Sequence, residues 1–189
     1  MKKLKHILAL AVVVFLTATN MNAQETKAVD TQESSINWKG YKVTGEHAGT
    51  ISISRGKLDF DNASLKGGSF VIDMNSINVT DLQGEYKAKL EGHLKSDDFF
   101  GVANFPIANL MFTTVSKDGN TYTVSGDLTI KSHTEKITFE IVVSGDHATA
   151  NLKIDRTKFD IKYGSASFFD GLKDKAIYDE FDVMVHLHF

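Results

Sequence analysis

Period-two alternation of apolar and polar residues constrains the fold of this chain more than any other feature. Successive side chains of a β-strand point to opposite faces, so this pattern is typical of a strand with one buried and one solvated face. About eight such runs follow one another with little helix between them. Their apolar positions include Ile51 and Ile53; Leu58 and Phe60; Phe70, Ile72 and Met74; Leu110 and Phe112; Tyr122, Val124, Leu128 and Ile130; Ile137, Phe139, Ile141 and Val143; Ala150, Leu152 and Ile154; and Phe181, Val183, Val185, Leu187 and Phe189.

Short segments rich in glycine and polar residues interrupt these runs and predict hairpin turns. They are Ser54-Arg55-Gly56, Lys66-Gly67-Gly68, Lys117-Asp118-Gly119-Asn120 and Ser144-Gly145-Asp146. A closed barrel and a two-sheet sandwich would both bury one face of every strand. The barrel is favoured because closure leaves no unpaired edge. We therefore predict an all-β fold, an antiparallel eight-stranded barrel.

One segment departs from the alternation and predicts a helix. Apolar side chains recur every fourth residue at Leu82, Tyr86, Leu90 and Leu94, with charged residues between them. That spacing is typical of an amphipathic helix, here of about three turns. Asp81 is the expected N-cap. We expect this helix to cap one mouth of the barrel.

Two further segments lack a regular pattern. Residues 164–176 carry the adjacent pair Phe168 and Phe169, and because large apolar side chains favour burial we expect this loop to fold over an opening of the barrel. Residues 24–34 are polar and predict a loose lead-in to the first strand.

The first 23 residues have the composition of a secretory signal peptide. Lysines near the start precede an apolar run at residues 7–16, and cleavage is expected after Ala23. Ten apolar residues are too few to span a bilayer, which takes about 20. The prediction is a signal peptide over residues 1–23 and a single exported domain over residues 24–189, located in the periplasm.

Composition argues against several classes of function. The sequence contains no cysteine, which excludes disulfides, thiol chemistry and cysteine-ligated zinc. Removal of residues 1–23, which hold three lysines and no acidic residue, takes the formal net charge from -3 to -6. Nucleic-acid binding draws on clustered lysine and arginine, so no nucleic-acid partner is expected. No cofactor is expected either.

The histidines could in principle serve metal binding or catalysis. His186 and His188 lie two residues apart, so they share a strand face at a spacing that could ligate a metal. The opposite face is apolar, and two exposed histidines without a metal are therefore favoured. His47, His93 and His133 lie near serines and aspartates, but no Gly-x-Ser-x-Gly elbow accompanies them. We expect no catalytic residues and no enzyme; a histidine-dependent hydrolase or isomerase is a minor alternative.

Aromatic residues indicate an enclosed apolar space. Phe99, Phe100 and Phe105 gather before the only proline, Pro106, where the predicted helix gives way to sheet. An eight-stranded barrel can either fill its interior or hold one small ligand, and the same aromatic residues could simply form a core. We predict a ligand site with an apolar lining. Its expected members are Trp38, Phe70, Ile72, Phe99, Phe100, Phe105, Phe112, Phe139, Ile141 and Phe168.

Three residues are candidates for contact with a polar head group: His47, His93 and Arg156. Arg156 ends a strand, where it could pair with Asp155 or with the Asp97-Asp98 pair. Alternatively, its guanidinium could meet an anionic head group at the barrel mouth.

Several motifs in order along the chain are similar to those of one family. The longest is His93-Leu94-Lys95-Ser96-x-Asp98-Phe99-Phe100-x-Val102-x-x-Phe105-Pro106; the others are Ser35-Ile36-x-Trp38, Gly126-Asp127-Leu128-Thr129-Ile130 and Ile154-Asp155-Arg156-Thr157-x-Phe159. Together they resemble the YceI-like family. The resemblance implies a lipocalin-like barrel, export to the periplasm, a long isoprenoid or similar amphiphile bound in an elongated tunnel, and no established catalysis.

One departure from the family pattern bears on the ligand. The family usually has Arg-Asp-Ala before the central histidine, where this chain has Leu90-Glu91-Gly92. Because this arginine is missing, we expect a lipid with a neutral or carboxylate head group as readily as a prenyl phosphate.

These observations predict periplasmic binding, for storage or transport, of a long-chain isoprenoid or another amphiphilic lipid. The protein is expected to be a monomer or homodimer without stable membrane insertion. A small outer-membrane β-barrel is the alternative, because the last strand alternates regularly and ends in Phe189.

Overall fold

A computed structural model describes residues 24–189 as nine strands, one α-helix and two short 3-10 helices. The predicted signal peptide, residues 1–23, lies outside the described residues. The strands are β1 (Gln24–Ala28), β2 (Ser35–Lys42), β3 (Gly45–Asp61), β4 (Ser64–Val79), β5 (Ile107–Asp118), β6 (Thr121–Ile130), β7 (His133–Ser144), β8 (His147–Asp155) and β9 (Ile177–His188). The helices are α1 (Gly84–Lys95), η1 (Arg156–Phe159) and η2 (Lys173–Lys175).

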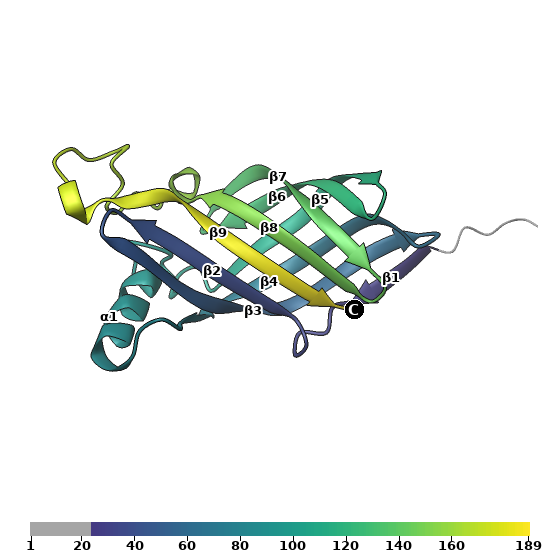
Figure 1. The fold of residues 1–189 in the computed structure, drawn as a ribbon, viewed down its shortest axis with the longest axis horizontal. Coiled ribbons are helices and arrows are strands. Elements are labelled where there is room, and N and C mark those ends of the chain that lie inside the picture. Colours follow the sequence, from purple (N-terminus) through teal and green to yellow (C-terminus); the bar gives the residue numbers. More distant parts are fainter. Residues whose placement is uncertain (1–23) are drawn as a thin grey trace, which may run out of the picture.

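Eight of the strands close into an antiparallel barrel (Figure 1). The order runs β3-β2-β9-β8-β7-β6-β5-β4, and β4 pairs again with β3. The predicted all-β, eight-stranded antiparallel barrel is confirmed. The predicted loose lead-in is wrong at its start, because β1 pairs with Lys57–Asp61 of β3, beyond the part of β3 that pairs with β2.

Two of the predicted hairpin turns are wrong, and interior glycines explain the error. β3 and β4 run straight through Gly56 and Gly68, and the chain reverses instead at Asn62 and Ala63, whose φ angles are 48° and 60°. A Cβ on Gly56 would lie 2.8 Å from the Phe70 ring, and one on Gly68 would lie 2.9 Å from the Phe112 ring. These glycines therefore make room for inward aromatic rings rather than for turns.

The other two predicted hairpins are confirmed. Gly119 links β5 to β6 and Gly145 links β7 to β8, with φ angles of 62° and 63°. Both positions lie in the left-handed region, which glycine occupies without a steric penalty.

The barrel interior is filled with side chains at the end that holds β1 and the C-terminus (Figure 1). The Phe60 and Phe189 rings meet there with centroids 5.6 Å apart. Leu58, Leu65 and Val124 are almost wholly inaccessible. The opposite end carries α1 and the long loop before β9 (Figure 1).

The two faces of the barrel wall differ in polarity, as β7 illustrates. Phe139 and Ile141 belong to the buried core and Ile137 packs against it, whereas Thr138 and Glu140 are exposed. A transmembrane barrel has the reverse arrangement, with an apolar outside and a polar inside. The alternation therefore disfavours the outer-membrane alternative.

The helix α1 stands beside the open end, and it is the single α-helix among residues 24–189. Leu90 and Leu94 line the interior, as the predicted apolar stripe requires. Tyr86, in contrast, is 75 % exposed, so the stripe does not extend to the first turn. No helix of the described chain is both long and apolar enough to cross a bilayer.

The long loop does not cover the opening, contrary to the prediction. Phe168 and Phe169 are 50 % and 51 % exposed, and neither lines the barrel interior. The Phe168 ring instead lies under the Lys162 ammonium, 5.1 Å from the ring centroid.

Close packing of Trp38 on Gly49 provides a test of the fold. A Cβ on Gly49 would lie 2.1 Å from the Asn78 carbonyl oxygen and 2.3 Å from the Trp38 ring. We expect Gly49→Ala to lower the free energy of unfolding by about 2 kcal/mol or more, because neither neighbour can move freely. Urea denaturation measures the change.

Gly40→Ala is the matched control, because a Cβ at this β2 position meets nothing within 4 Å. Its effect should stay within about 0.5 kcal/mol. Equal effects of the two substitutions would contradict the packing described.

Candidate ligand-binding cavity

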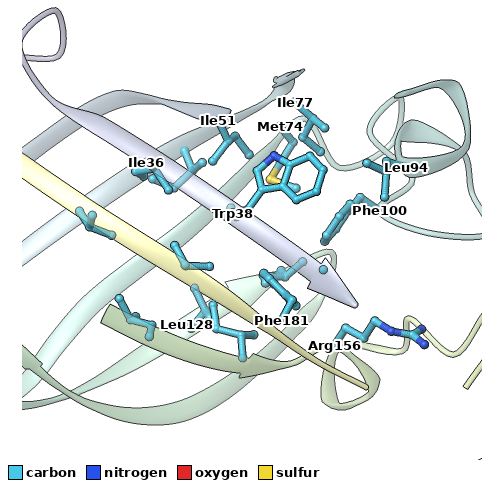
Figure 2. Close-up of a pocket in the computed structure, with 18 of the residues that line it drawn as sticks. Ile36, Trp38, Ile51, Met74, Ile77, Leu94, Phe100, Leu128, Arg156 and Phe181 are labelled. Carbon is cyan, nitrogen blue, oxygen red and sulfur yellow. The ribbon is translucent and has the colours of Figure 1, made fainter. Parts of the chain in front are cut away.

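A partly open cavity of about 440 Å³ lies inside the barrel toward the α1 end. Its lining surface is almost entirely apolar. Figure 2 shows the Trp38 ring near Met74 and Ile77, with Leu94 and Phe100 approaching from the helix and the turn after it. The volume lies in the range of small-molecule sites, about 300–1,000 Å³.

Three neighbouring aromatic rings that line this cavity also pack in the core of the closed end. The Phe112 centroid lies 5.7 Å from that of Phe70 and 5.8 Å from that of Phe139. Phe60 and Tyr122 are buried nearer the closed end and do not line the cavity. The space is therefore a pocket that ends inside the barrel.

Eight of the ten apolar residues predicted for the ligand site line the cavity: Trp38, Phe70, Ile72, Phe99, Phe100, Phe112, Phe139 and Ile141. The other two, Phe105 and Phe168, lie in loops outside it. Phe105 packs beside Gly101 and under the Lys131 ammonium. Whether the eight residues contact a ligand stays a prediction.

The residue selection from sequence missed several lining residues that the alternation pattern contained. They include Ile51, Leu128, Ile154, Phe181 and Val183. Each lies on the inward face of its strand. Selecting every second residue along each strand would therefore have found them. Met74 and Ile77 also line the cavity; Met74 continues the alternation of Phe70 and Ile72, whereas Ile77 falls out of step with it because the β3–β4 register shifts between Asp73 and Asn78.

His93 presents an unpaired nitrogen at this cavity. Its ring packs edge-on against Tyr163 and Phe99, with centroids 4.5 Å and 5.6 Å away. Nε2 is buried and, among the described residues, has no hydrogen-bond partner. A buried polar atom without a partner is costly, which makes Nε2 an available contact for a polar ligand group.

His47 also lines the cavity, but its ring is already engaged. Its Nδ1 lies 2.8 Å from the Asp81 carboxylate, which also accepts the Ala48 N–H. Burial disfavours the charged carboxylate, but these hydrogen bonds outweigh it and hold the pKa of Asp81 below its ordinary value. The predicted N-cap role of Asp81 is wrong: Gln83 holds that position, without a side-chain cap.

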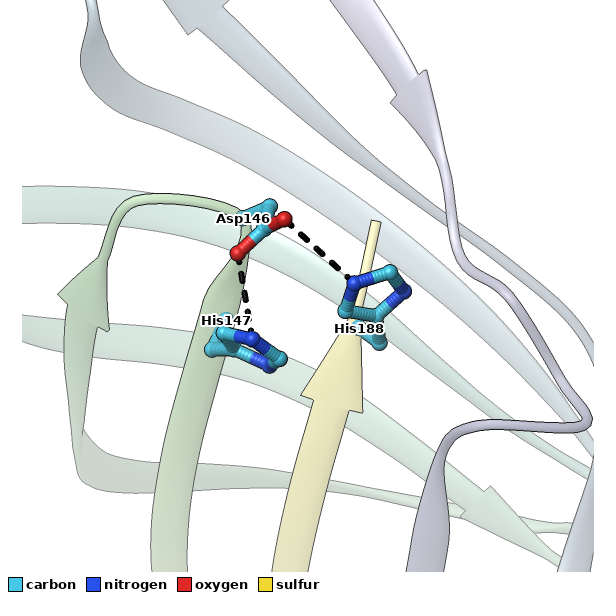
Figure 3. Close-up of side chains that lie close together, drawn as sticks. All are labelled: Asp146, His147 and His188. Carbon is cyan, nitrogen blue, oxygen red and sulfur yellow. Dashed lines mark ion pairs between the residues drawn. The ribbon is translucent and has the colours of Figure 1, made fainter.

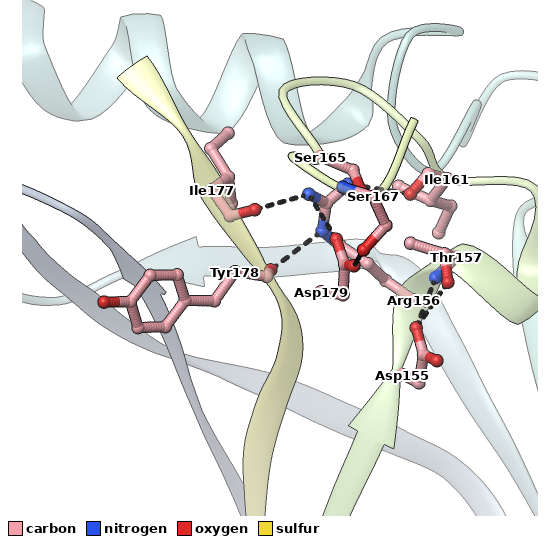
Figure 4. A network of polar contacts seen from close by, with 9 residues as sticks. All are labelled: Asp155, Arg156, Thr157, Ile161, Ser165, Ser167, Ile177, Tyr178 and Asp179. Carbon is pink, nitrogen blue, oxygen red and sulfur yellow. Dashed lines mark hydrogen bonds and ion pairs between the residues drawn. The ribbon is translucent and has the colours of Figure 1, made fainter. Parts of the chain in front are cut away.

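Arg156 is almost fully buried beside the cavity, and the backbone satisfies its guanidinium (Figure 4). Its Nε, Nη1 and Nη2 atoms donate to the carbonyl oxygens of Tyr178, Ile161 and Ile177 at 3.1, 2.7 and 3.0 Å. Burial lowers the pKa of Arg156, and the charge of Asp179, 3.6 Å away, opposes that shift.

The predicted partners of Arg156 are therefore wrong. Its ion pair is with Asp179, whereas Asp155 accepts the backbone N–H and the hydroxyl of Thr157. Asp97 accepts a hydrogen bond from the Asn104 amide instead. Arg156 thus joins η1 and Ile161 to the start of β9 at the mouth, and Ser167 of the long loop donates to the same Asp179 carboxylate.

The three histidines considered for catalysis do not come together. His47 and His93 line the cavity, whereas His133 begins β7 and is exposed. Although Lys42 and Arg156 also contribute to it, the lining surface is almost entirely apolar, an arrangement suited to holding a hydrophobic group.

Comparison with known proteins agrees with this architecture. A model of the YceI-like domain matches residues 28–189. A UPF0312 protein of Shewanella denitrificans is 29 % identical over 150 residues, covering 75 % of this chain and 74 % of the relative. Protein YceI of Salmonella arizonae is 28 % identical over 151 residues, covering 77 % and 74 %.

Solved structures share the fold. Burkholderia cenocepacia BcnA has a TM-score of 0.68 and 23 % identity, covering 84 % of this chain and 98 % of that one. A domain from Saccharophagus degradans, described as polyisoprenoid-binding and implicated in plant cell wall breakdown, has a TM-score of 0.57 and 18 % identity. That match covers 88 % of this chain and 97 % of the domain.

The buried guanidinium provides a second prediction. We expect Arg156→Ala to lower the free energy of unfolding by about 3–5 kcal/mol, because it leaves Asp179 and three carbonyl oxygens without their partner. Thermal or urea denaturation measures the loss.

The other arginine of the chain, Arg55, is exposed on β3 and serves as the control. Arg55→Ala should change stability by no more than about 0.5 kcal/mol. If Arg156→Ala were equally mild, the structural role assigned to Arg156 would be refuted.

Proposed function

The chain belongs to the YceI-like family, and on this premise we propose that its barrel binds a long isoprenoid or another long-chain amphiphile. One observation carries the proposal: a cavity of about 440 Å³ with an almost wholly apolar lining, open at one end of the barrel. The shared fold of the polyisoprenoid-binding Saccharophagus degradans domain supports it.

Apolar burial alone provides enough free energy for such a ligand. Each methylene group removed from water contributes about 0.8 kcal/mol. Ten of them contribute about 8 kcal/mol, which corresponds to micromolar binding before the costs of ordering the chain. A strong polar contact is therefore unnecessary for affinity and would serve to orient the ligand.

The polar end of the ligand meets His93 in this proposal. Of the three head-group candidates, Arg156 donates to backbone carbonyls and His47 pairs with Asp81. His93 Nε2 is the remaining buried polar atom without a partner among those three side chains. A neutral imidazole Nε2 can accept from a hydroxyl or donate to a carboxylate, depending on its tautomer.

We place the protein in the periplasm, because residues 1–23 have the composition of a signal peptide. Binding for storage or transport, rather than catalysis, is the proposed role. The apolar lining and the separated histidines support that choice.

Lipid extraction tests the proposal directly. The protein is expressed with residues 1–23, purified from the periplasm, and extracted with organic solvent for mass spectrometry. We expect one dominant class of long-chain amphiphile in near-stoichiometric amount. Repeated absence of lipid, together with no uptake of prenyl or fatty chains by the extracted protein, would contradict the proposal.

A larger side chain inside the cavity should weaken lipid binding, whereas the same side chain on the outside of the barrel should not. Ala150 is buried and lines the cavity from β8, whereas the adjacent Thr149 is exposed. We expect Ala150→Phe to weaken lipid binding by at least about tenfold, since the ring occupies ligand space. Thr149→Phe adds the same ring outside and should leave affinity unchanged; titration of both variants with a prenyl alcohol measures the difference.

Replacing His93 distinguishes the contribution of the polar head group to ligand affinity from the contribution of the buried apolar tail. His93→Phe keeps a ring between Phe99 and Tyr163 but removes Nε2. A single hydrogen bond contributes about 1 kcal/mol, so binding of a prenyl alcohol or fatty acid should weaken about fivefold. Binding of a hydrocarbon of equal length should not change; equal effects on both ligands would argue against the contact.

A further inference from the structure

A cluster of side chains of metal-binding types lies at the closed end of the barrel, and none of its members lines the cavity. Asp146, His147 and His188 place one carboxylate oxygen and two imidazole nitrogens within 4.8 Å of one another. Figure 3 shows the Asp146 carboxylate between the two rings, with one oxygen toward each. The separations from Nε2 of His147 and of His188 are 3.1 Å and 3.4 Å.

The backbone holds these three groups in register. His147 and His188 are direct cross-strand partners on β8 and β9, a position that brings their side chains together on one face. Their ring centroids are 4.7 Å apart. Asp146 belongs to the β7–β8 turn, and its carbonyl oxygen accepts the Phe189 N–H at 2.9 Å.

We propose that Asp146, His147 and His188 form a surface site for a divalent transition-metal ion of the Zn²⁺ class. Zinc bonds of about 2.0–2.1 Å at tetrahedral angles place ligand atoms about 3.4 Å apart. The two oxygen–nitrogen separations lie near that spacing but involve different oxygens, Oδ1 for His147 and Oδ2 for His188. Asp146 is exposed, so its carboxylate can rotate to bring one oxygen toward both nitrogens. His147 is exposed, so its ring can rotate to bring the two nitrogens to the same distance.

The donor set selects the metal. Two imidazoles and one carboxylate suit Zn²⁺, Cu²⁺ or Ni²⁺, whereas Mg²⁺ and Ca²⁺ prefer oxygen ligands alone. Three protein ligands leave at least one coordination position for water or for a group from another molecule.

The site differs from the one that the sequence spacing suggested. His186 and His188 share a strand face, but the cluster pairs His188 with its cross-strand partner His147 instead. His186 is opposite Thr149 on the same sheet and is exposed. It therefore supplies a matched control: a histidine on the same face of the same strand, outside the cluster.

Calorimetric titration with Zn²⁺ tests the proposal on protein purified without a polyhistidine tag. We expect one saturable site in the wild type, and at least about tenfold weaker binding in His147→Gln, since loss of even an outer-shell partner costs 10- to 100-fold. His186→Gln should retain wild-type affinity. Titration with Mg²⁺ should give no comparable heat.

His188→Gln and Asp146→Asn should weaken Zn²⁺ binding like His147→Gln. Because His188 is half-buried, each variant is compared with wild type by thermal denaturation without metal; His147 is exposed and gives the decisive comparison. Zn²⁺ should also raise the melting temperature of wild type but not of His147→Gln. Absence of saturable binding in wild type, or equal loss in His186→Gln and His147→Gln, would overturn the proposal.

Discussion

The pairing of β3 with β4 closes the sheet, and the rest of the structure depends on that closure. Closure leaves no sheet edge along the barrel wall and gives every strand an inward face that either packs in the core or lines the cavity. The two strands are 17 and 16 residues long, which makes the barrel deep. A chain without cysteine has no disulfides, so its stability relies on the burial of apolar surface. The closed wall provides that burial along the inward face of each strand.

Depth allows the interior to serve two purposes. Phe60, Leu65 and Val124 fill the closed end and supply a core, while the Phe70, Phe112 and Phe139 rings pack against one another, belong to or contact that core, and line the cavity. At the mouth, Arg156 fastens the segment after η1 to the start of β9 through the carbonyl oxygens of Ile161 and Ile177. The chain thus combines a packed base with a cavity whose walls are held in place.

The alternation of apolar and polar residues predicted the barrel and contained most of the cavity residues. Side chains of a strand repeat their direction every second residue, so the pattern shows which of them face inward. It could not predict the turn at Asn62, where no glycine marks the left-handed conformation, and it mistook Gly56 and Gly68 for turns. The role of Arg156 also could not be predicted from the sequence. Its partners are mostly backbone carbonyl groups, which every residue carries. The His147 and His188 pair required the strand register, which no local pattern contains.

Trp38 allows the central claim, that a long apolar chain occupies the cavity, to be tested in one measurement. It is the only tryptophan in the sequence and it lines the cavity. The measurement is a titration of delipidated protein with a long-chain amphiphile brominated along its tail. Binding as described predicts saturable quenching of Trp38 fluorescence at one ligand per barrel, reversed by an unbrominated chain of equal length. Quenching no stronger than that by a short, water-soluble bromoalcohol would contradict it.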